Sequence, residues 1–251
     1  ETVVTSINKA GKRHNDDLDD KLVDRLVSIG KGAAGFIPMI GGPLAEVVGN
    51  VIPGQRADRV AKYLRALSAR VEQLESTVQE TLLEYPEKVD LIEEGGYQAA
   101  RATSSKRIEM IVEAVSRGLT LDDADLVRRK RLLTILGELD EDEMVLLHAY
   151  GRAYGSGEMN PFSEVNRPEP AYLGSSIEAI ESEKLYESGP MHLLRMGLLT
   201  KNYGNLKKGQ LPEFNAKNGD FKHRTEISYL GRMLLKEVGM PTELDSKRGN
   251  R

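Results

Sequence analysis

Residues 35–67 read GFIPMIGGPLAEVVGNVIPGQRADRVAKYLRAL, an apolar run broken by Gly and Pro that passes directly into a basic, helix-forming sequence. Glu46 is the only charged residue between positions 33 and 52. Water solvates such a run poorly, so it must be covered by protein, by a partner or by a bilayer. We therefore expect the fold to be organised around this segment.

The apolar run is long enough to span a bilayer, but Pro38, Pro43 and the five glycines between positions 32 and 49 argue against one straight membrane helix. We expect a turn at 38–42 and two short apolar helices. This helical hairpin either stays buried in the core or leaves it to enter a membrane. The side chains that would face a membrane or a partner are Phe36, Ile37, Met39, Ile40, Leu44, Val47, Val48, Val51 and Ile52.

Residues 55–83 carry apolar side chains at alternating intervals of four and three, which predicts one long helix packed lengthwise against another helix. Its partner could lie in the same chain or in a second copy. The first turns also carry Arg56, Arg59 and Lys62, which suit lipid headgroups or a solvated helix face. The candidate self-association seam is Val60, Leu64, Leu67, Val71, Leu74 and Val78.

The remainder of the N-terminal half reads as helical. Residues 1–15 are polar and aperiodic, as in a flexible lead-in, and 16–31 predict a helix whose first acidic residues suit the helix dipole better than a cation site. Pro86 begins the next helix, which Gly95 and Gly96 are expected to kink or interrupt, and a further helix covers 121–139. We expect a helical domain over 16–139.

A different pattern begins near residue 140. We expect a helix at 141–150, a loop at 151–169, and helices at 176–186 and 190–197. Strands at 211–215 and 221–227, joined by an Asn-Gly turn at 217–220, predict a hairpin. Ser228 is expected to cap a last helix at 229–238, before a polar tail at 242–251. This order resembles a winged helix, so we expect a mainly α protein with a winged-helix-like α+β domain over 140–241.

A winged helix suggests DNA binding. The helix in the reading position offers only His192 and Arg195 and follows several glutamates, which makes a poor surface for a DNA groove. A protein-binding or structural role is therefore favoured, and another α+β arrangement stays open. The candidate phosphate contacts are Lys207, Lys208, Lys217, Lys222 and Arg224.

The composition excludes several classes of site. The 251 residues contain no cysteine, so disulfides, thiolate metal sites and cysteine nucleophiles are ruled out. A net charge of −4 argues against non-specific coating of nucleic acid. The four histidines lack metal-ligand spacing, and no phosphate-binding loop or nucleophile elbow is present. We expect no catalytic, metal or cofactor site, no small-molecule substrate, and a cytoplasmic protein that can associate with membranes on activation.

Three stretches carry a family resemblance: IPMIGGPLAEVVGNVIPGQRADRVAKYL at 37–64, MGLL at 196–199 and ISYLGRMLL at 227–235. Together they resemble the bacterial abortive-infection alpha family. The resemblance implies defence against phage, by arresting or killing the infected cell, and it brings no catalytic residues. The leading hypothesis is a non-enzymatic phage-defence effector with a protein partner or a homo-oligomeric state. A winged-helix DNA-binding regulator and a self-associating helical subunit are the alternatives.

Overall fold

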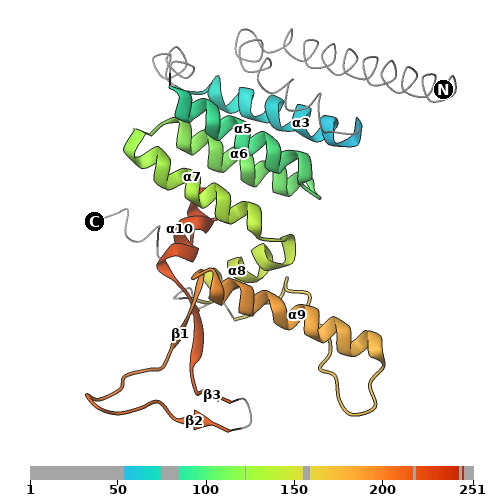
Figure 1. Cartoon of the computed structure of the whole chain (residues 1–251), viewed down its shortest axis with the longest axis vertical. Coiled ribbons are helices and arrows are strands. Elements are labelled where there is room, and N and C mark those ends of the chain that lie inside the picture. Colours follow the sequence, from blue (N-terminus) through green and yellow to red (C-terminus); the bar gives the residue numbers. More distant parts are fainter. Residues whose placement is uncertain are drawn as a thin grey trace, which may run out of the picture. The chain divides into compact units, whose positions relative to one another are not determined.

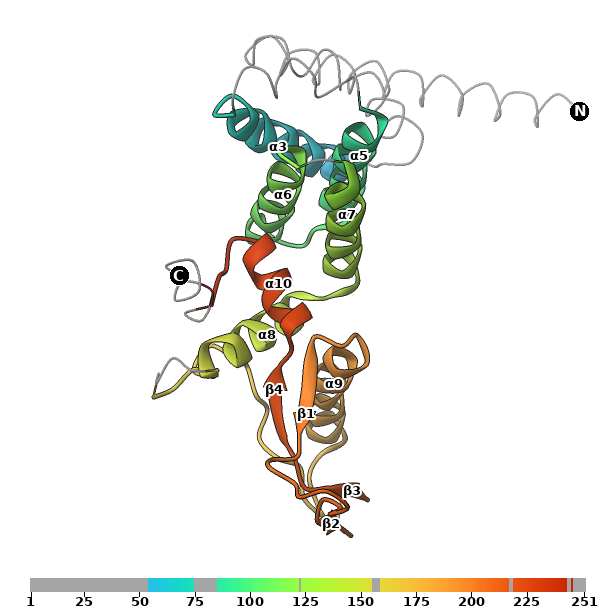
Figure 2. The same cartoon turned by 90° about the vertical axis from the view of Figure 1, so that its left-hand side faces the viewer.

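The computed structural model describes residues 54–74, 85–121, 123–154, 159–216, 219–242 and 245. The lead-in 1–15, the predicted helix 16–31, the apolar segment 33–53 and Val78 lie outside the described residues. The described part contains seven helices and four short strands, which confirms the mainly helical fold class (Figures 1 and 2). The described residues fall into two compact units, divided between Thr134 and Ile135.

The N-terminal unit is built on three helices that each pack against the other two. These are α3 (Gly54–Val71), α5 (Pro86–Arg101) and α6 (Ser105–Leu119), and most of α7 (Asp123–Glu138) belongs to the same unit. Figure 1 shows α3, α5 and α6 lying side by side. Their facing side chains form an apolar core that contains Val60, Tyr63, Leu64, Leu67, Val71, Ile92, Ile111 and Val115.

Two helix boundaries differ from the prediction. The helix expected over 55–83 ends at Val71 and is followed by a turn. The glycine pair does not interrupt α5, which continues to Arg101; the chain breaks afterwards, where the Ser104 side chain accepts a hydrogen bond from the Arg107 amide and begins α6. Gly95 instead lets α5 approach Tyr63 closely, so the glycine serves packing rather than a kink.

The C-terminal unit places α8 (Glu141–Ala153) against α9 (Ile177–Arg195) and α10 (Tyr229–Glu237). Strand β1 (Leu199–Asn202) pairs antiparallel with β4 (Arg224–Ile227), and β2 (Phe214–Asn215) pairs with β3 (Asp220–Phe221). Both antiparallel strand pairs lie within residues 199–227, and we call this part of the chain the hairpin arm. Figure 1 shows it running out beyond α8 and α10.

The hairpin and the last helix are confirmed in part. Strands at 211–215 and 221–227 are shorter than expected and split into β2, β3 and β4, and β1 was not predicted. Ser228 caps α10 as expected, since its hydroxyl accepts a hydrogen bond from the Gly231 amide at 3.0 Å. The two helices expected at 176–186 and 190–197 are one helix that contains Pro190. Gly189 eases this continuity, because a Cβ before proline disfavours helical geometry.

Candidate functional site

The hairpin arm carries an excess of basic residues, with six Lys or Arg residues against three Asp or Glu. Each of its acidic residues pairs with a cation of the arm itself. Lys201 pairs with Asp220, Lys222 Nζ lies 2.6 Å from a Glu213 oxygen, and Arg224 lies 2.8 Å from Glu226. Two of the predicted phosphate contacts, Lys222 and Arg224, are thus engaged in ion pairs within the arm.

The pair of Lys201 and Asp220 joins β1 to the hairpin tip. A hydrogen bond from Lys201, then one from the Phe221 amide, lowers the pKa of Asp220, and the same hydrogen bond raises the pKa of Lys201. Both groups are therefore charged at neutral pH. The stabilisation from this pair is present above the ordinary pKa of an aspartate and is lost as pH falls through the lowered pKa of Asp220.

The cations that remain are Lys207 and Lys208, which are exposed in the loop between β1 and β2. No carboxylate of the described residues lies within ion-pair distance of either. Lys217, the other predicted phosphate contact, lies outside the described residues. Five exposed apolar side chains occur in the same arm as the two lysines. They are Tyr203, Leu206, Leu211, Phe214 and Phe221.

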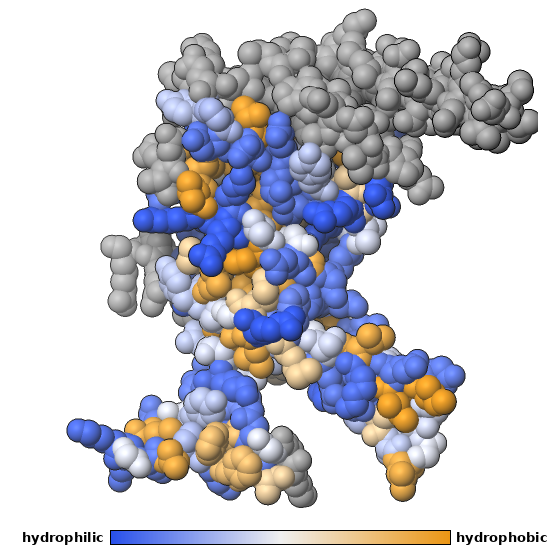
Figure 3. Space-filling view, viewed as in Figure 1, coloured by the Kyte–Doolittle hydropathy of each residue, from blue (hydrophilic) through white to orange (hydrophobic). Residues whose placement is uncertain are grey.

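Helix α9 is also exposed over most of its length, and Leu193 is its buried residue. The face opposite Leu193 carries Ile177, Ile180 and Met191, all exposed. Figure 3 shows apolar surface both on the hairpin arm and on α9 with its preceding loop. His192 faces the unit, because its Nδ1 lies 2.6 Å from a Glu143 carboxylate oxygen, so it is not presented to a DNA groove.

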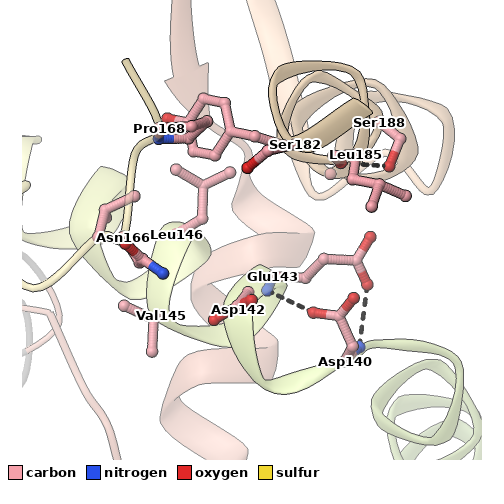
Figure 4. Close-up of a pocket in the computed structure, with 13 residues that line it drawn as sticks. Asp140, Asp142, Glu143, Val145, Leu146, Asn166, Pro168, Ser182, Leu185 and Ser188 are labelled. Carbon is pink, nitrogen blue, oxygen red and sulfur yellow. Dashed lines mark hydrogen bonds between the residues drawn. The ribbon is translucent and has the colours of Figure 1, made fainter. Parts of the chain in front are cut away.

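A cavity of about 380 Å³ lies between α8, α9 and the loop before α9 (Figure 4). Its acidic wall is the beginning of α8. Asp140 accepts a hydrogen bond from the Glu143 amide at 2.7 Å, and Glu143 accepts one from the Asp140 amide at 2.9 Å. Ser188 donates its hydroxyl proton to the Leu185 carbonyl. These hydrogen bonds cap α8 or lie within α9, so the polar groups that form them have a structural role.

The exposed side of α3 is basic. Arg56, Lys62 and Arg65 are exposed, against the single exposed acid Asp58 over the helix. No carboxylate of the described residues pairs with these three cations. Arg59 and Arg70, by contrast, are held within the unit: Arg59 donates to the Ala100 carbonyl, and Arg70 pairs with Glu113 at 3.0 Å. Residues 54–71 thus follow the apolar segment directly and present free cations on their solvent side.

The predicted self-association seam is largely enclosed by its own chain. Val60, Leu64, Leu67 and Val71 are at most 2% exposed, since α5 and α6 cover them. Leu74 is half-buried in the turn after α3, and Val78 lies outside the described residues. A second copy could not reach the first four residues without opening the three-helix core.

The described residues contain no group of three or more His, Cys, Asp or Glu side chains that could hold a metal ion. Within the same residues, none of the helices has both the length and the apolar character needed to cross a membrane. No protein-family model, curated protein or solved structure matches the chain.

Proposed function

We propose that this chain is a non-enzymatic effector of phage defence that acts on the bacterial membrane through residues 36–52. The observation that carries the proposal is the order of the sequence: an apolar run with one charge is followed at once by a helix with free, exposed cations. Apolar side chains favour the hydrocarbon region, and neighbouring cations favour anionic headgroups.

The basic side of α3 supports this mode of action. Arg56, Lys62 and Arg65 keep their charges unpaired within the described residues, while the apolar side of α3 is used by the three-helix core. The helix can therefore remain folded with its cations against lipid. Each cation near an anionic surface contributes about 1 kcal/mol of attraction. The proposed role in phage defence rests on the family resemblance over 37–64, 196–199 and 227–235.

We assign the C-terminal unit the fold of a winged-helix-like domain and the role of sensing the trigger through a protein contact. The order α8, α9, β1, hairpin, β4 supports the fold. A protein target is favoured over DNA for two reasons. The hairpin pairs three of its cations with its own carboxylates, and α9 carries four glutamates where a DNA-reading helix would need donors.

The membrane action is tested by leakage of dye from anionic vesicles. Gly42→Asp places a carboxylate inside the apolar run, and a charge at the centre of a bilayer costs about 3 kcal/mol. We expect the unmodified chain to make the vesicles release their dye. If the chain alone causes no release, lysate of phage-infected bacteria is added as the source of the trigger, and release is expected then. The Gly42→Asp variant should leak at least about tenfold more slowly.

Gly137→Asp is the matched control, because Gly137 is exposed on α7, a different helix from the one that carries the cations of α3, and the change adds the same charge outside the apolar run. It should leak like the unmodified chain. Equal leakage from all three proteins would contradict the proposal, and so would vesicles that stay intact with and without the lysate.

A further inference from the structure

Two projecting parts of the C-terminal unit carry opposite excess charge. One is the hairpin arm, residues 199–227. The other is α9 with the end of its preceding loop, residues 172–195, which we call the helix arm. The helix arm contains four glutamates against Lys184 and Arg195, whereas the hairpin arm has a surplus of lysine and arginine.

On each arm, some charged side chains have no ion-pair partner among the described residues. In the helix arm, Lys184 is used by Glu187 at 2.7 Å, and no cation of the described residues pairs with Glu178 or Glu181. A hydrogen bond from its own backbone amide, then one from Ser176, lowers the pKa of Glu178, so it is charged at neutral pH. In the hairpin arm, Lys207 and Lys208 are the unpaired cations among the described residues.

Exposed apolar side chains accompany these charges on both arms. On the helix arm, Tyr172 is 76% and Ile177 70% exposed, and Ile180 lies beside Glu181 in the sequence. On the hairpin arm, Leu211 is 78% and Phe214 57% exposed. Apolar groups interleaved with unpaired charge are typical of surfaces that bind a partner, because the apolar contacts give affinity and the charges give register.

Within one unit, no ion pair of the described residues joins the two arms. Figure 1 shows α9 and the β1–β4 pair running in diverging directions below α8, although β1 packs against α9. A second copy supplies the complementary surface for each. We propose that two copies of this chain dimerise by placing the hairpin arm of each on the helix arm of the other.

This reciprocal contact explains why one unit carries a basic arm and an acidic arm. Two copies related by a twofold axis form two identical contacts, and the contacts close without leaving a free arm to extend a polymer. Lys207 and Lys208 then face Glu178 and Glu181, while Leu211 and Phe214 cover Ile177 and Ile180. The dimer uses surfaces that are exposed in one chain and leaves the buried seam of α3 untouched.

Charge reversal with the full chain tests the proposal, by sedimentation velocity and light scattering without vesicles. Lys207→Glu/Lys208→Glu makes both arms acidic, and Glu178→Lys/Glu181→Lys makes both arms basic. We expect the unmodified chain to dimerise, and each variant alone to dimerise at least about tenfold more weakly. An equimolar mixture of the two variants should restore a 1:1 dimer, because each hairpin arm then meets a helix arm of opposite charge.

The control Arg65→Glu/Lys106→Glu changes two exposed cations of the N-terminal unit and should dimerise like the unmodified chain. Restoration by mixing also shows that both variants are folded. An unmodified chain that stays monomeric at every concentration would overturn the proposal. A dimer that the charge reversals do not weaken would also overturn it, and so would a mixture of the two variants that stays monomeric. Variants that dimerise normally and lose only vesicle or DNA binding would overturn it as well. None of these results depends on membrane leakage.

Discussion

Replacing Gly231 with alanine is expected to destabilise the C-terminal unit by about 3 kcal/mol, at the upper end of the cost of overpacking a core. A Cβ at this position would lie 2.3 Å from the Leu198 carbonyl oxygen and 2.9 Å from Ile227 Cγ1. Leu198 precedes β1 and its oxygen also accepts the Ser228 amide hydrogen bond, so this backbone cannot move away freely. α10 must therefore separate from the β1–β4 pair.

The measurement is native-state hydrogen exchange combined with urea denaturation. The amides of β1 and α10 should lose protection, while those of α3 and α6 in the other unit should keep theirs. Gly137→Ala is the matched control, since Gly137 is exposed on a helix and alanine gains up to about 1 kcal/mol in helix propensity. Protection of α10 that survives Gly231→Ala would show that the close approach is not needed.

The second large effect is expected at Gly95, where alanine should destabilise the N-terminal unit by about 2 kcal/mol. Its Cβ would lie 2.4 Å from the Tyr63 hydroxyl oxygen and 2.8 Å from Val115 Cγ2. Tyr63 is fully buried and donates its hydroxyl to the Ile92 carbonyl at 2.9 Å. Burial also raises the pKa of Tyr63, so the hydroxyl stays neutral and keeps this hydrogen bond.

A double-mutant cycle with Tyr63→Phe separates this crowding from a general weakness of the helix. Removing the hydroxyl costs about 1 kcal/mol by itself, because a buried hydrogen bond is lost. It also removes the atom nearest to the new methyl group. Gly95→Ala should therefore cost at least about 1 kcal/mol less in the Tyr63→Phe variant than in the unmodified chain, measured by urea denaturation. Additive effects of the two changes would contradict the packing explanation.

Local chemistry made several parts of the fold predictable. Pro86 begins α5 because the first turn of a helix tolerates a missing amide donor, and Ser228 begins α10 because its hydroxyl satisfies a free amide. The apolar periodicity of residues 60–71 predicted a lengthwise helix contact, and α5 and α6 provide it. In each case the deciding groups lie within a few residues of one another.

Features that depend on distant partners were not predictable. β1 is only a short polar-apolar stretch and becomes a strand by pairing with β4, which is distant in the sequence. Gly95 reads as a helix breaker until Tyr63 is placed beside it. Counting lysines in the hairpin suggested a phosphate surface, but the count could not reveal that Lys222 and Arg224 have carboxylate partners. The charge that remains available is a property of the folded arm.

We propose separate tasks for the two units. The three-helix core of the N-terminal unit is closed, and α3 carries exposed cations directly after the apolar segment in the sequence. In our proposal the C-terminal unit presents its two arms to a protein. Membrane action and dimerisation then depend on different residues, so each is expected to be removable without the other. Gly42→Asp should leave the dimer intact, and the charge-reversed arms should leave the apolar segment unchanged.

The most direct test of membrane action uses the absence of cysteine from the sequence. Val47→Cys carries an environment-sensitive fluorophore within the apolar segment, and Gly137→Cys carries it at an exposed position of α7, a different helix from the one that carries the cations of α3. With anionic vesicles, and with lysate of phage-infected bacteria where a trigger is needed, we predict a blue shift and increased emission at position 47 and little change at position 137. Emission at position 47 that stays unchanged in both conditions, or shifts no more than at position 137, would contradict the proposed membrane action.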